Sequence, residues 1–364
     1  MKKIENQIIR KTKTLSYTSE MALQQTIKCG VIGVGRMGSH HARVYSCLEG
    51  VELVGVFDQS EERRNDIVES WGGVSCDSIE ALINLGVEAV TIATPTSTHL
   101  EVAVPLLEQG IACLIEKPLA PNAEEAAIIA DAATKGSAVL QVGHVVRYDP
   151  VMRAISSIEN LNPRFIEMTR ISPMTFRSTD VGVVLDMMIH DLDLLTMLIG
   201  KEPVDIYANA VSVMGEAEDV CNARLVFPRE SNNQSCTANV TASRLAMKTE
   251  RKLRIISEDA YLSADFVKGS VTLIRKKANE SQLFDLRTRL SAGEDLSSID
   301  YVDLLEVEEM DVGDADALTM QAEDFLDSIR TGRHPDIDAE AGSMAIRTAE
   351  RIIRQAVDAG AKMV

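Results

Sequence analysis

Short apolar runs alternate with segments of helical periodicity between residues 26 and 146. The runs that predict strands are Ile27 to Ile32, Val51 to Phe57, Ala89 to Ala93, Ile111 to Ile115 and Ala138 to Val142. Helices are predicted between them, for example after Asp58 as far as about Trp71. Strands that are apolar throughout and alternate with helices are typical of a parallel sheet covered on both faces. We therefore predict an α/β domain with a doubly wound parallel sheet over residues 26–146.

The pattern changes in the second part of the chain, residues 147–364. Successive β-rich or alternating segments there predict strands at Val204 to Val213, Asn222 to Phe227, Ser235 to Ala242, Arg251 to Ile256 and Ala260 to Val267. They fit one open, antiparallel-dominated sheet. The segment Asp336 to Met363 predicts a long amphipathic helical region that packs back on the first domain. This part is predicted to be a second α/β domain.

The composition is that of an ordinary globular chain and narrows the range of partners. Of 364 residues, 45% are hydrophobic and 25% charged, and the net charge is −18. Such a charge repels phosphate backbones and anionic lipid surfaces, so neither nucleic acid nor a membrane is predicted as a partner. Between Glu294 and Asp327 there are 13 Asp or Glu and no Lys or Arg, which we interpret as a solvated face.

The cysteines and the N-terminal segment point to a cytoplasmic protein. The six cysteines are far apart and form no C-x-x-C pair, so we interpret them as reduced core residues. No apolar run reaches the length of about 18 residues that a transmembrane helix needs. Residues 1–25 carry several basic residues and no apolar core of signal-peptide length, and we predict a disordered extension. Met21 is an alternative start to Met1.

A glycine pattern follows the first predicted strand directly. Gly33-x-Gly35-x-x-Gly38 stands between that strand and a helix. Gly33 permits the tight turn, Gly35 lets the backbone approach a pyrophosphate, and Gly38 lets the helix lie close to its strand. The pyrophosphate would bind free N–H groups at the helix N-terminus, where the helix dipole favours negative charge. This order predicts a Rossmann-type dinucleotide site.

An acidic residue at the end of the next strand supports this prediction. Asp58 follows Gly38 by about 20 residues, the usual distance for a carboxylate that accepts hydrogen bonds from the adenosine ribose. Because the same carboxylate repels a 2′-phosphate, NAD is predicted over NADP. Arg63 and Arg64 keep NADP as the alternative, and Asp58 could instead cap the helix that begins near Ser60.

Polar residues also follow the later strands of the first domain. Thr94, Pro95 and Thr96 come after the third of these strands, and Thr98 with Glu101 has the spacing of a capping box. Ligands of such folds bind at the carboxyl ends of the strands. The residues assigned to cofactor binding are Gly33, Gly35, Arg36, Met37, Gly38, Asp58, Thr94, Pro95, Thr96, His99 and Glu116. His99 could equally be a helix-start residue held by a backbone carbonyl.

Glu116-Lys117-Pro118 ends the next strand. Proline fixes its own φ and restricts the residue before it, so we expect Lys117 to be held in place and to point at the ligand cleft. After the last strand, Asp149 is predicted to cap a helix with Pro150 at its first position.

Four motifs in this order resemble the glucose–fructose oxidoreductase/inositol dehydrogenase (Gfo/Idh/MocA) family, over nearly the whole chain after residue 26. They are the glycine fingerprint, Thr94-Pro95-Thr96-x-x-His99, Glu116-Lys117-Pro118 and Gly143-His144-x-x-Arg147-Tyr148. The resemblance implies a Rossmann domain followed by an α/β domain with an open mixed sheet, residues 147–364, that serves substrate binding and oligomerisation. It also implies NAD(P)-dependent oxidation or reduction of a sugar or polyol carbon, and a homodimer or homotetramer.

The resemblance further implies that the lysine of the EKP motif and an Asp-x-x-x-His pair are catalytic. Asp186 and His190 match that pair, and with Asp193 they share one stripe of a buried helix at i, i+4 and i+7. The structural alternative is a satisfied polar network. In the catalytic reading, His190 takes the hydroxyl proton, Lys117 donates to the same oxygen, and Asp186 orients His190. We expect these groups to converge on one sugar carbon. No metal is predicted.

Within the family, the likeness is to the branch that acts on nucleotide-linked amino sugars, the UDP-N-acetylglucosamine 3-dehydrogenases. Cations of the second domain could bind a diphosphate. The residues assigned to substrate binding are Lys117, Arg147, Tyr148, Arg170, Arg177, His190 and Arg244. A free inositol or hexose is the alternative substrate, and a non-catalytic NAD(P)-binding regulatory protein is the alternative from another class.

Overall fold

The computed structural model describes residues 26–175, 181–214, 217–228, 235–296 and 301–361. Its contacts divide it into two compact units. The first runs to Val145 and also includes Asp316–Ile346; the second is Val146–Ala315 with the chain from Arg347 onward. The sequence analysis placed one domain boundary near residue 146 and assigned all later residues to the second domain. In the structure, Asp316–Ile346 belong to the first unit.

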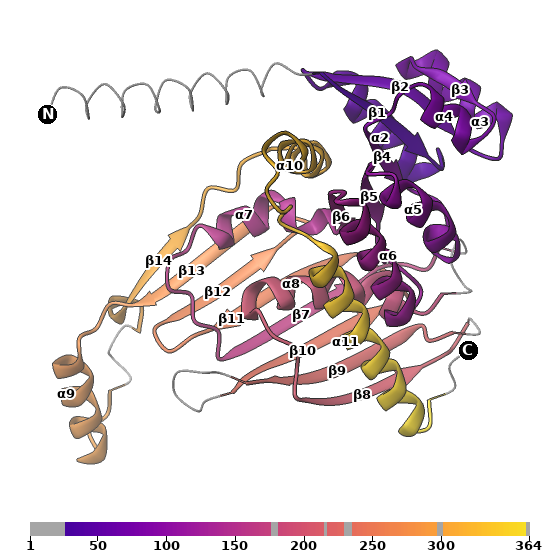
Figure 1. Cartoon of the computed structure of the whole chain (residues 1–364). Coiled ribbons are helices and arrows are strands. Elements are labelled where there is room, and N and C mark those ends of the chain that lie inside the picture. Colours follow the sequence, from indigo (N-terminus) through magenta and orange to yellow (C-terminus); the bar gives the residue numbers. More distant parts are fainter. Residues whose placement is uncertain (1–25, 176–180, 215–216, 229–234, 297–300, 362–364) are drawn as a thin grey trace, which may run out of the picture. The chain divides into compact units, whose positions relative to one another are not determined.

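The first unit is built on a six-stranded sheet in which every pair is parallel. The strands are β1 (Ile27–Ile32), β2 (Val51–Phe57), β3 (Val74–Cys76), β4 (Ala89–Ile92), β5 (Ala112–Glu116) and β6 (Leu140–Gly143). Their order is β3-β2-β1-β4-β5-β6, so the chain reverses direction across the sheet between β1 and β4 (Figure 1). The predicted doubly wound parallel sheet is confirmed.

Helices follow the strands in turn. They are α2 (Arg36–Cys47), α3 (Glu61–Trp71), α4 (Ile79–Asn84), the 3₁₀ turn η1 (Thr96–Thr98), α5 (His99–Glu108) and α6 (Ala123–Gly136). Ser60, Ser78 and Asn122 cap α3, α4 and α6 by accepting a backbone N–H. The capping box predicted at Thr98 is wrong. Because η1 gives Thr98 a helical backbone, its hydroxyl donates back to Thr94 Oγ1 and the Pro95 carbonyl oxygen instead.

Part of the acidic stretch forms a helix, α10 (Ala317–Thr331), that belongs to the first unit. The buried apolar side chains of α10 are Leu318, Ala322, Phe325 and Leu326, and they join the core around β1 and α2. Gln141 of β6 donates to the Gln321 carbonyl oxygen at 3.0 Å. The prediction of a solvated face is therefore wrong for the side of α10 that carries these apolar residues. It is correct for residues 306–309, which are exposed.

The second unit contains an eight-stranded mixed sheet. Its strands are β7 (Phe165–Ile171), β8 (Asp205–Val211), β9 (Val220–Phe227), β10 (Cys236–Ser243), β11 (Glu250–Ile256), β12 (Ala260–Asp265), β13 (Ser270–Lys276) and β14 (Leu305–Glu309). The order is β14-β13-β12-β11-β7-β10-β9-β8, and β7 pairs with β10 in parallel while the other pairs are antiparallel. This confirms the predicted open, largely antiparallel sheet. β7, β13 and β14 were not predicted.

One face of this sheet is covered by helices (Figure 1). The helical elements of this part are η2 (Val145–Tyr148), α7 (Pro150–Ser156), the π-helix η3 (Val184–Met188), α8 (Ile189–Ile199), α9 (Glu280–Ser291) and η4 (Tyr301–Leu304). The long helix α11 (Ala339–Asp358) begins in the first unit and ends in the second. Asp149 caps α7 as predicted, by accepting from Val151 N.

Two expectations from composition can be compared with the described residues. All six cysteines are free thiols and all but Cys47 are buried. Burial raises the pKa of Cys221 to about 12, so this thiol stays protonated at neutral pH. No helix in the described ranges is both long and apolar enough to cross a bilayer.

Candidate functional site

The strand ends of the first unit lie in register at one edge of the sheet. Ile32 pairs with Phe57 on one side and with Ile92 on the other. Ile92 in turn pairs with Ile115, which pairs with Val142. Because all these strands are parallel, the residues that follow them lie along a single edge, where ligands of open α/β sheets bind. This edge is the candidate cofactor site.

The three glycines of the fingerprint are needed for three different reasons. Gly33 has φ +84°, and a Cβ there would meet the backbone of Ala93 and Thr94 at 2.8 Å. A Cβ on Gly38 would lie 1.9 Å from the Gly33 carbonyl oxygen, so only glycine lets α2 approach the loop. A Cβ on Gly35 would meet nothing within 4 Å. Gly35 thus leaves open space beside the start of α2, which is what an approaching pyrophosphate requires.

The N-terminus of α2 is suited to an anion. Within the described residues, no side chain caps this helix and its first turn holds no acid. Arg36 is exposed at its first position and Met37 is half-buried. Free N–H groups together with the helix dipole favour a phosphate at such an end. The residues present therefore fit a dinucleotide.

Asp58 supports the glycine loop as well as facing this edge. Its Oδ2 accepts from Val34 N at 2.9 Å and its Oδ1 accepts from Ser60 N at 2.9 Å. The cap of α3 is Ser60 and not Asp58, contrary to the structural alternative weighed from the sequence. Arg64 donates to the Asp58 carbonyl oxygen, and Arg63 is exposed with its guanidinium 3.8 Å from the carboxylate.

Some of the residues after β4 make hydrogen bonds to the backbone. Thr94 and Thr96 are half-buried and Pro95 is exposed. His99 is buried, with Nδ1 3.2 Å from the Leu119 carbonyl oxygen and Nε2 3.1 Å from the Thr94 carbonyl oxygen. Burial lowers the pKa of His99, although these carbonyls act in the opposite direction. The contacts favour a helix-start histidine held by the backbone.

The Glu116–Lys117–Pro118 motif ends β5. Glu116 is buried and its Oε1 lies 2.8 Å from Nε2 of the fully buried His41 on α2. Lys117 is half-buried, and the peptide bond to Pro118 is cis. Glu116 thereby joins α2 to the end of β5, directly before the lysine.

In the second unit, Asp186 and His190 lie on either side of a change in helix type. Asp186 is in the π-helix η3 and His190 is in the first turn of α8. Both are half-buried, whereas Val184, Met188 and Ile189 are buried. The sequence predicted one continuous α-helix. π-turns widen the backbone, and they occur often at functional sites.

Asp193, predicted on the same stripe, is bound by an arginine. Arg147 donates to it through Nε at 2.8 Å and through Nη2 at 2.6 Å, and both side chains are almost completely buried. A two-pronged contact of this kind fixes orientation as well as distance. It attaches α8 to η2, three residues beyond His190.

A second buried pair holds α8 directly beside His190. Arg170 of β7 donates to Asp191 Oδ1 through Nε at 3.0 Å and Nη2 at 2.7 Å. Burial lowers the pKa of Arg251, and the neighbouring Arg170 lowers it further. Burial also raises the pKa of Asp149, which faces Arg251 and Arg170. Two arginine–aspartate pairs, at Asp191 and Asp193, therefore attach α8 within three residues after His190.

A third pair fixes the loop before η3. Arg244 donates to Asp219 Oδ1 at 2.6 Å and to the Val181 carbonyl oxygen at 2.7 Å. Glu218 is buried and accepts from Val184 N at 3.0 Å at the start of η3. A Cβ on Gly182 would lie 1.9 Å from the Glu218 carboxylate, so a larger residue there would displace this side chain. Burial raises the pKa of Glu218.

These contacts bear on the residues assigned to substrate binding. Arg147, Arg170 and Arg244 are engaged in ion pairs, and Tyr148 is buried. The pairs of Arg147 and Arg170 hold α8 and that of Arg244 holds the loop before η3, and this geometry gives no support for binding a diphosphate. Arg177 lies outside the described residues. Within the described ranges, no group of three or more His, Cys, Asp or Glu could hold a metal ion.

The sequence analysis did not identify the partners of these arginines. Asp191 and Asp219 were missed because each meets an arginine more than 20 positions away in the sequence. Glu218, which accepts from Val184 N, was missed for the same reason. The one available indication was that Asp191 stands beside His190 in an otherwise apolar helix, since a buried carboxylate needs a partner.

Two family models match the chain. A model described as an oxidoreductase family with an NAD-binding Rossmann fold, GFO/IDH/MocA, matches residues 27–144. The model of the GFO/IDH/MocA C-terminal domain matches residues 161–263. The chain therefore belongs to the GFO/IDH/MocA family of NAD-binding oxidoreductases, which confirms the resemblance seen in the motifs.

Several characterised proteins are similar to this chain. UDP-N-acetylglucosamine 3-dehydrogenase from Acidithiobacillus ferrooxidans is 33% identical over 333 residues, covering 92% of this chain and 98% of that protein. A scyllo-inositol 2-dehydrogenase (NAD(+)) from Bacillus subtilis is 31% identical, covering 50% of this chain and 56% of that protein.

Solved structures show the same fold. That of the A. ferrooxidans enzyme, GnnA, aligns with a TM-score of 0.79 at 32% identity, over 90% of this chain and 97% of that one. Levoglucosan dehydrogenase in complex with NADH aligns with a TM-score of 0.75 at 17% identity, over 92% of this chain and 98% of that one. At this lower identity the likeness concerns the fold alone.

Proposed function

We propose that this protein is an NAD-dependent dehydrogenase that oxidises the 3-hydroxyl of a UDP-linked amino sugar such as UDP-N-acetylglucosamine. The cofactor part is supported by the open space at Gly35, beside the N-terminus of α2. Asp58 lies next to this loop, because its carboxylate accepts a hydrogen bond from Val34 N. The observation that carries the substrate part is the similarity to UDP-N-acetylglucosamine 3-dehydrogenase, which extends over 92% of this chain.

The proposed chemistry is the removal of a hydride from carbon and a proton from oxygen. NAD supplies the acceptor for the hydride when it is bound. His190 takes the hydroxyl proton, so that the C–O bond can become a carbonyl. Lys117 donates a hydrogen bond to the same oxygen and stabilises its developing negative charge. Asp186 orients the imidazole of His190.

The ion pairs of the second unit support the role given to His190. A general base must be held within hydrogen-bond reach of the proton that it takes. Asp191 and Asp193 anchor α8 through Arg170 and Arg147, so the backbone that carries His190 has little freedom to shift. The π-turn at Asp186 is a second feature that favours a functional interpretation of this segment.

Asp58 is the basis for choosing NAD over NADP. Its carboxylate accepts backbone N–H groups on both oxygens and is held at the end of β2. A 2′-phosphate at the adenosine ribose would lie against this negative charge, which costs binding energy. The exposed guanidinium of Arg63 is the group that would accommodate such a phosphate if the preference were reversed.

An inositol is the alternative substrate, since a scyllo-inositol 2-dehydrogenase is 31% identical over half of this chain. The two alternatives differ in the need for a diphosphate-linked nucleotide. Purified protein should be mixed with NAD and, separately, with UDP-N-acetylglucosamine, UDP-glucose, N-acetylglucosamine, myo-inositol and scyllo-inositol. The readouts are the absorbance of reduced cofactor and the mass of the sugar product.

We expect a product two mass units lighter than UDP-N-acetylglucosamine, by the loss of two hydrogens in a carbinol-to-ketone oxidation. An added aminotransferase that consumes the ketone should draw an unfavourable equilibrium forward. Turnover of an inositol with none of the UDP-sugar would replace the proposed substrate. Binding of NAD without turnover of any member of the panel would favour a non-catalytic, regulatory protein.

A further inference from the structure

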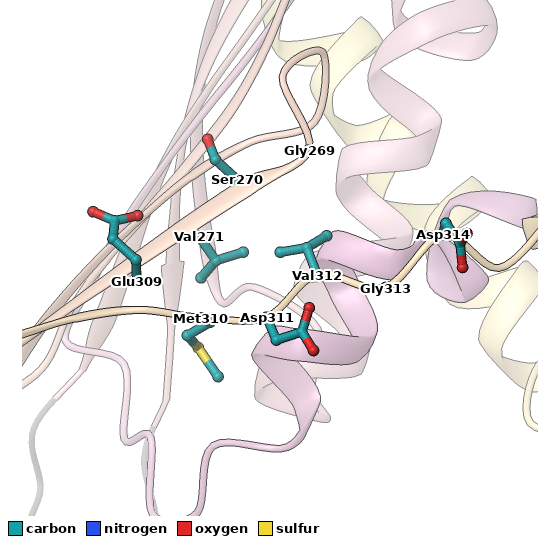
Figure 2. Close-up of a pocket in the computed structure, with 9 residues that line it drawn as sticks. All are labelled: Gly269, Ser270, Val271, Glu309, Met310, Asp311, Val312, Gly313 and Asp314. Atoms are coloured by element: carbon teal, nitrogen blue, oxygen red, sulfur yellow. The ribbon is translucent and has the colours of Figure 1, made fainter.

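Glu116, at the end of β5, is a buried carboxylate in an acidic chain. Around the open groove in Figure 2, Glu309, Asp311 and Asp314 are exposed, so water can hydrate their carboxylates. Glu116 is only 7% exposed. A buried carboxylate is costly unless a protein donor replaces the water that it has lost. The donor to Glu116 is therefore expected to matter for the residue that follows, Lys117.

This donor comes from α2. Nε2 of His41 lies 2.8 Å from Glu116 Oε1, and His41 is completely buried. The other ring nitrogen, Nδ1, is also buried and has no hydrogen-bond partner among the residues that the structure describes. A proton on Nδ1 would be an unpaired buried donor, which costs free energy. The His41 proton is therefore on Nε2, and the ring donates a hydrogen bond to the carboxylate.

Gly143 of β6 leaves the space in which the Glu116 carboxylate lies. The two residues are paired across the sheet. A Cβ on Gly143 would lie 2.9 Å from Glu116 Cα and 3.1 Å from its carboxylate carbon and Oε2. The φ angle of Gly143 is outside the left-handed region, so its own backbone does not require glycine. Oε1 thus faces the His41 ring, and Oε2 lies next to the bare backbone of β6.

The chain on the other side of Lys117 is held by a second buried histidine. Nδ1 of His99 lies 3.2 Å from the Leu119 carbonyl oxygen, and Leu119 is completely buried. Lys117 itself is half-buried. The residue before the lysine is therefore attached to α2, and the second residue after it is attached to the start of α5.

The helix α2 also carries the candidate pyrophosphate site, at its N-terminus. Its buried side is attached to β4 as well, since the Tyr45 hydroxyl lies 2.7 Å from Thr91 Oγ1. His41 and Tyr45 are one turn apart on the same side of the helix. The helix at which the cofactor is expected to bind is thus joined to the end of β5 through His41, directly before Lys117.

We propose that His41 is a positioning residue for Lys117: it holds Glu116 at the end of β5 and thereby fixes the lysine ammonium relative to the start of α2. This inference rests on the proposed function, in which Lys117 donates to the oxygen that is oxidised. A shift of about 1 Å at a reacting group can lower a rate by about 100-fold, so His41 affects the reaction without touching the substrate.

Single-turnover formation of reduced cofactor from NAD and UDP-N-acetylglucosamine tests this effect. His41→Leu removes the donor and should slow the step by roughly 10- to 100-fold while NAD affinity is retained. His41→Gln, whose amide nitrogen can replace Nε2 as the donor, should stay within about threefold of wild type. The matched control is His40→Leu, the same change at the neighbouring exposed histidine of α2, which should react at the wild-type rate.

A double-mutant cycle with Lys117→Ala separates positioning from a general structural role. Because His41 acts through Lys117, His41→Leu should cause no further slowing once the lysine is gone. Equal slowing by His41→Leu with and without the lysine would mean that His41 only supports the fold, and would overturn the proposal. A wild-type rate in His41→Leu would overturn it as well.

A second variant reaches the same carboxylate without changing His41. Gly143→Ala places a Cβ 3.1 Å from Glu116 Oε2 and should displace the carboxylate from the ring. It should therefore also slow the step, but not in the Lys117→Ala background. If His41→Leu does not fold, Gly143→Ala takes its place in the cycle, with the same outcomes.

Hydrogen exchange of residues 112–119, followed by mass spectrometry, needs no substrate. It should be faster in His41→Leu than in wild type and His40→Leu, because the end of β5 has lost its contact with α2. If wild type leaves UDP-N-acetylglucosamine unchanged, the proposed function fails, whereas faster exchange in His41→Leu would still support the fixing of the segment around Lys117. Unchanged exchange in His41→Leu would overturn the proposal whatever the substrate.

Discussion

The candidate site residues of the two units are held in different ways. In the first, the candidate cofactor site is made of backbone and glycine, and its carboxylate at Asp58 accepts two main-chain N–H groups. In the second, the segment around His190 is held by buried ion pairs between side chains, Arg170 with Asp191 and Arg147 with Asp193. The first arrangement leaves room for a ligand. The second leaves little room for movement.

The difference has an energetic consequence. Backbone N–H groups at a helix start are neutral donors, so they need no counter-charge when the site is empty. A buried ion pair is sensitive to the loss of either member, because the remaining charge has already been taken out of water. We therefore expect substitutions in the second unit to act on stability, and substitutions in the glycine loop to separate stability from ligand binding.

The largest effect on stability is expected at Asp193. The change Asp193→Ala removes the carboxylate to which Nε and Nη2 of Arg147 donate, and should lower the free energy of unfolding by about 3–5 kcal/mol. The double change Asp193→Leu with Arg147→Met removes both charges and should cost clearly less. Urea denaturation of the three proteins measures this. Equal losses of unfolding free energy in Asp193→Ala and in the double variant would contradict the view that an unpaired buried charge causes the loss.

The glycine loop should show the separation directly. Gly38→Ala places a Cβ 1.9 Å from the Gly33 carbonyl oxygen and should cost about 1–3 kcal/mol of stability along with cofactor binding. Gly35→Ala meets nothing within 4 Å and should leave stability within about 0.5 kcal/mol of wild type. It should still weaken NAD binding. Thermal unfolding and calorimetric titration distinguish the two, and a Gly35→Ala protein with full NAD affinity would remove the proposed pyrophosphate contact.

A smaller effect is expected from His99, through pH. Because burial lowers its pKa in the folded state, the folded protein favours the neutral ring. Its contribution to stability is present above the ordinary pKa of about 6.5 and is lost as pH falls below that value. The unfolding free energy of wild type should therefore fall more steeply between about pH 7 and pH 5 than that of His99→Gln. Parallel curves for the two proteins would be inconsistent with a buried neutral histidine.

The smallest effect is expected where an ion pair is exposed. Arg254 donates to Glu167 at 2.6 Å on the open side of the second sheet, but both side chains are more than 40% exposed. Replacing Arg254 with Gln should change the free energy of unfolding by less than about 1 kcal/mol, since solvent screens such pairs. A loss of unfolding free energy as large as that of Asp193→Ala would mean that burial does not explain the difference between the Arg254–Glu167 and Arg147–Asp193 pairs.

The first unit could be predicted from sequence because its motifs are local. Gly33, Asp58 and Lys117 each stand directly after an apolar strand, so a strand pattern fixes their place at one sheet edge. The residues that lie near them in space also follow strands of the same sheet. The capping box at Thr98 failed because the preceding 3₁₀ turn competes for the same hydroxyl.

The second unit could be predicted less well because its contacts are not local. Arg147 and Asp193 are 46 positions apart, and Arg244 and Asp219 are 25 apart. No periodicity indicates which arginine meets which aspartate. The core side of α10 was hidden for a different reason, since its Leu318 and Phe325 lie within a stretch whose composition is dominated by acids. The π-turn before α8 has no sequence pattern that we could have used.

The central claim is that Lys117 and His190 carry the proton chemistry of a sugar oxidation. The most direct measurement is single-turnover formation of reduced cofactor from NAD and UDP-N-acetylglucosamine by wild type, Lys117→Ala and His190→Ala, with Lys268→Ala as the control at an exposed lysine. We predict that the first two changes slow this step by about 10²–10⁴-fold while NAD affinity and the control rate are retained. Wild-type rates in Lys117→Ala or His190→Ala would contradict the account.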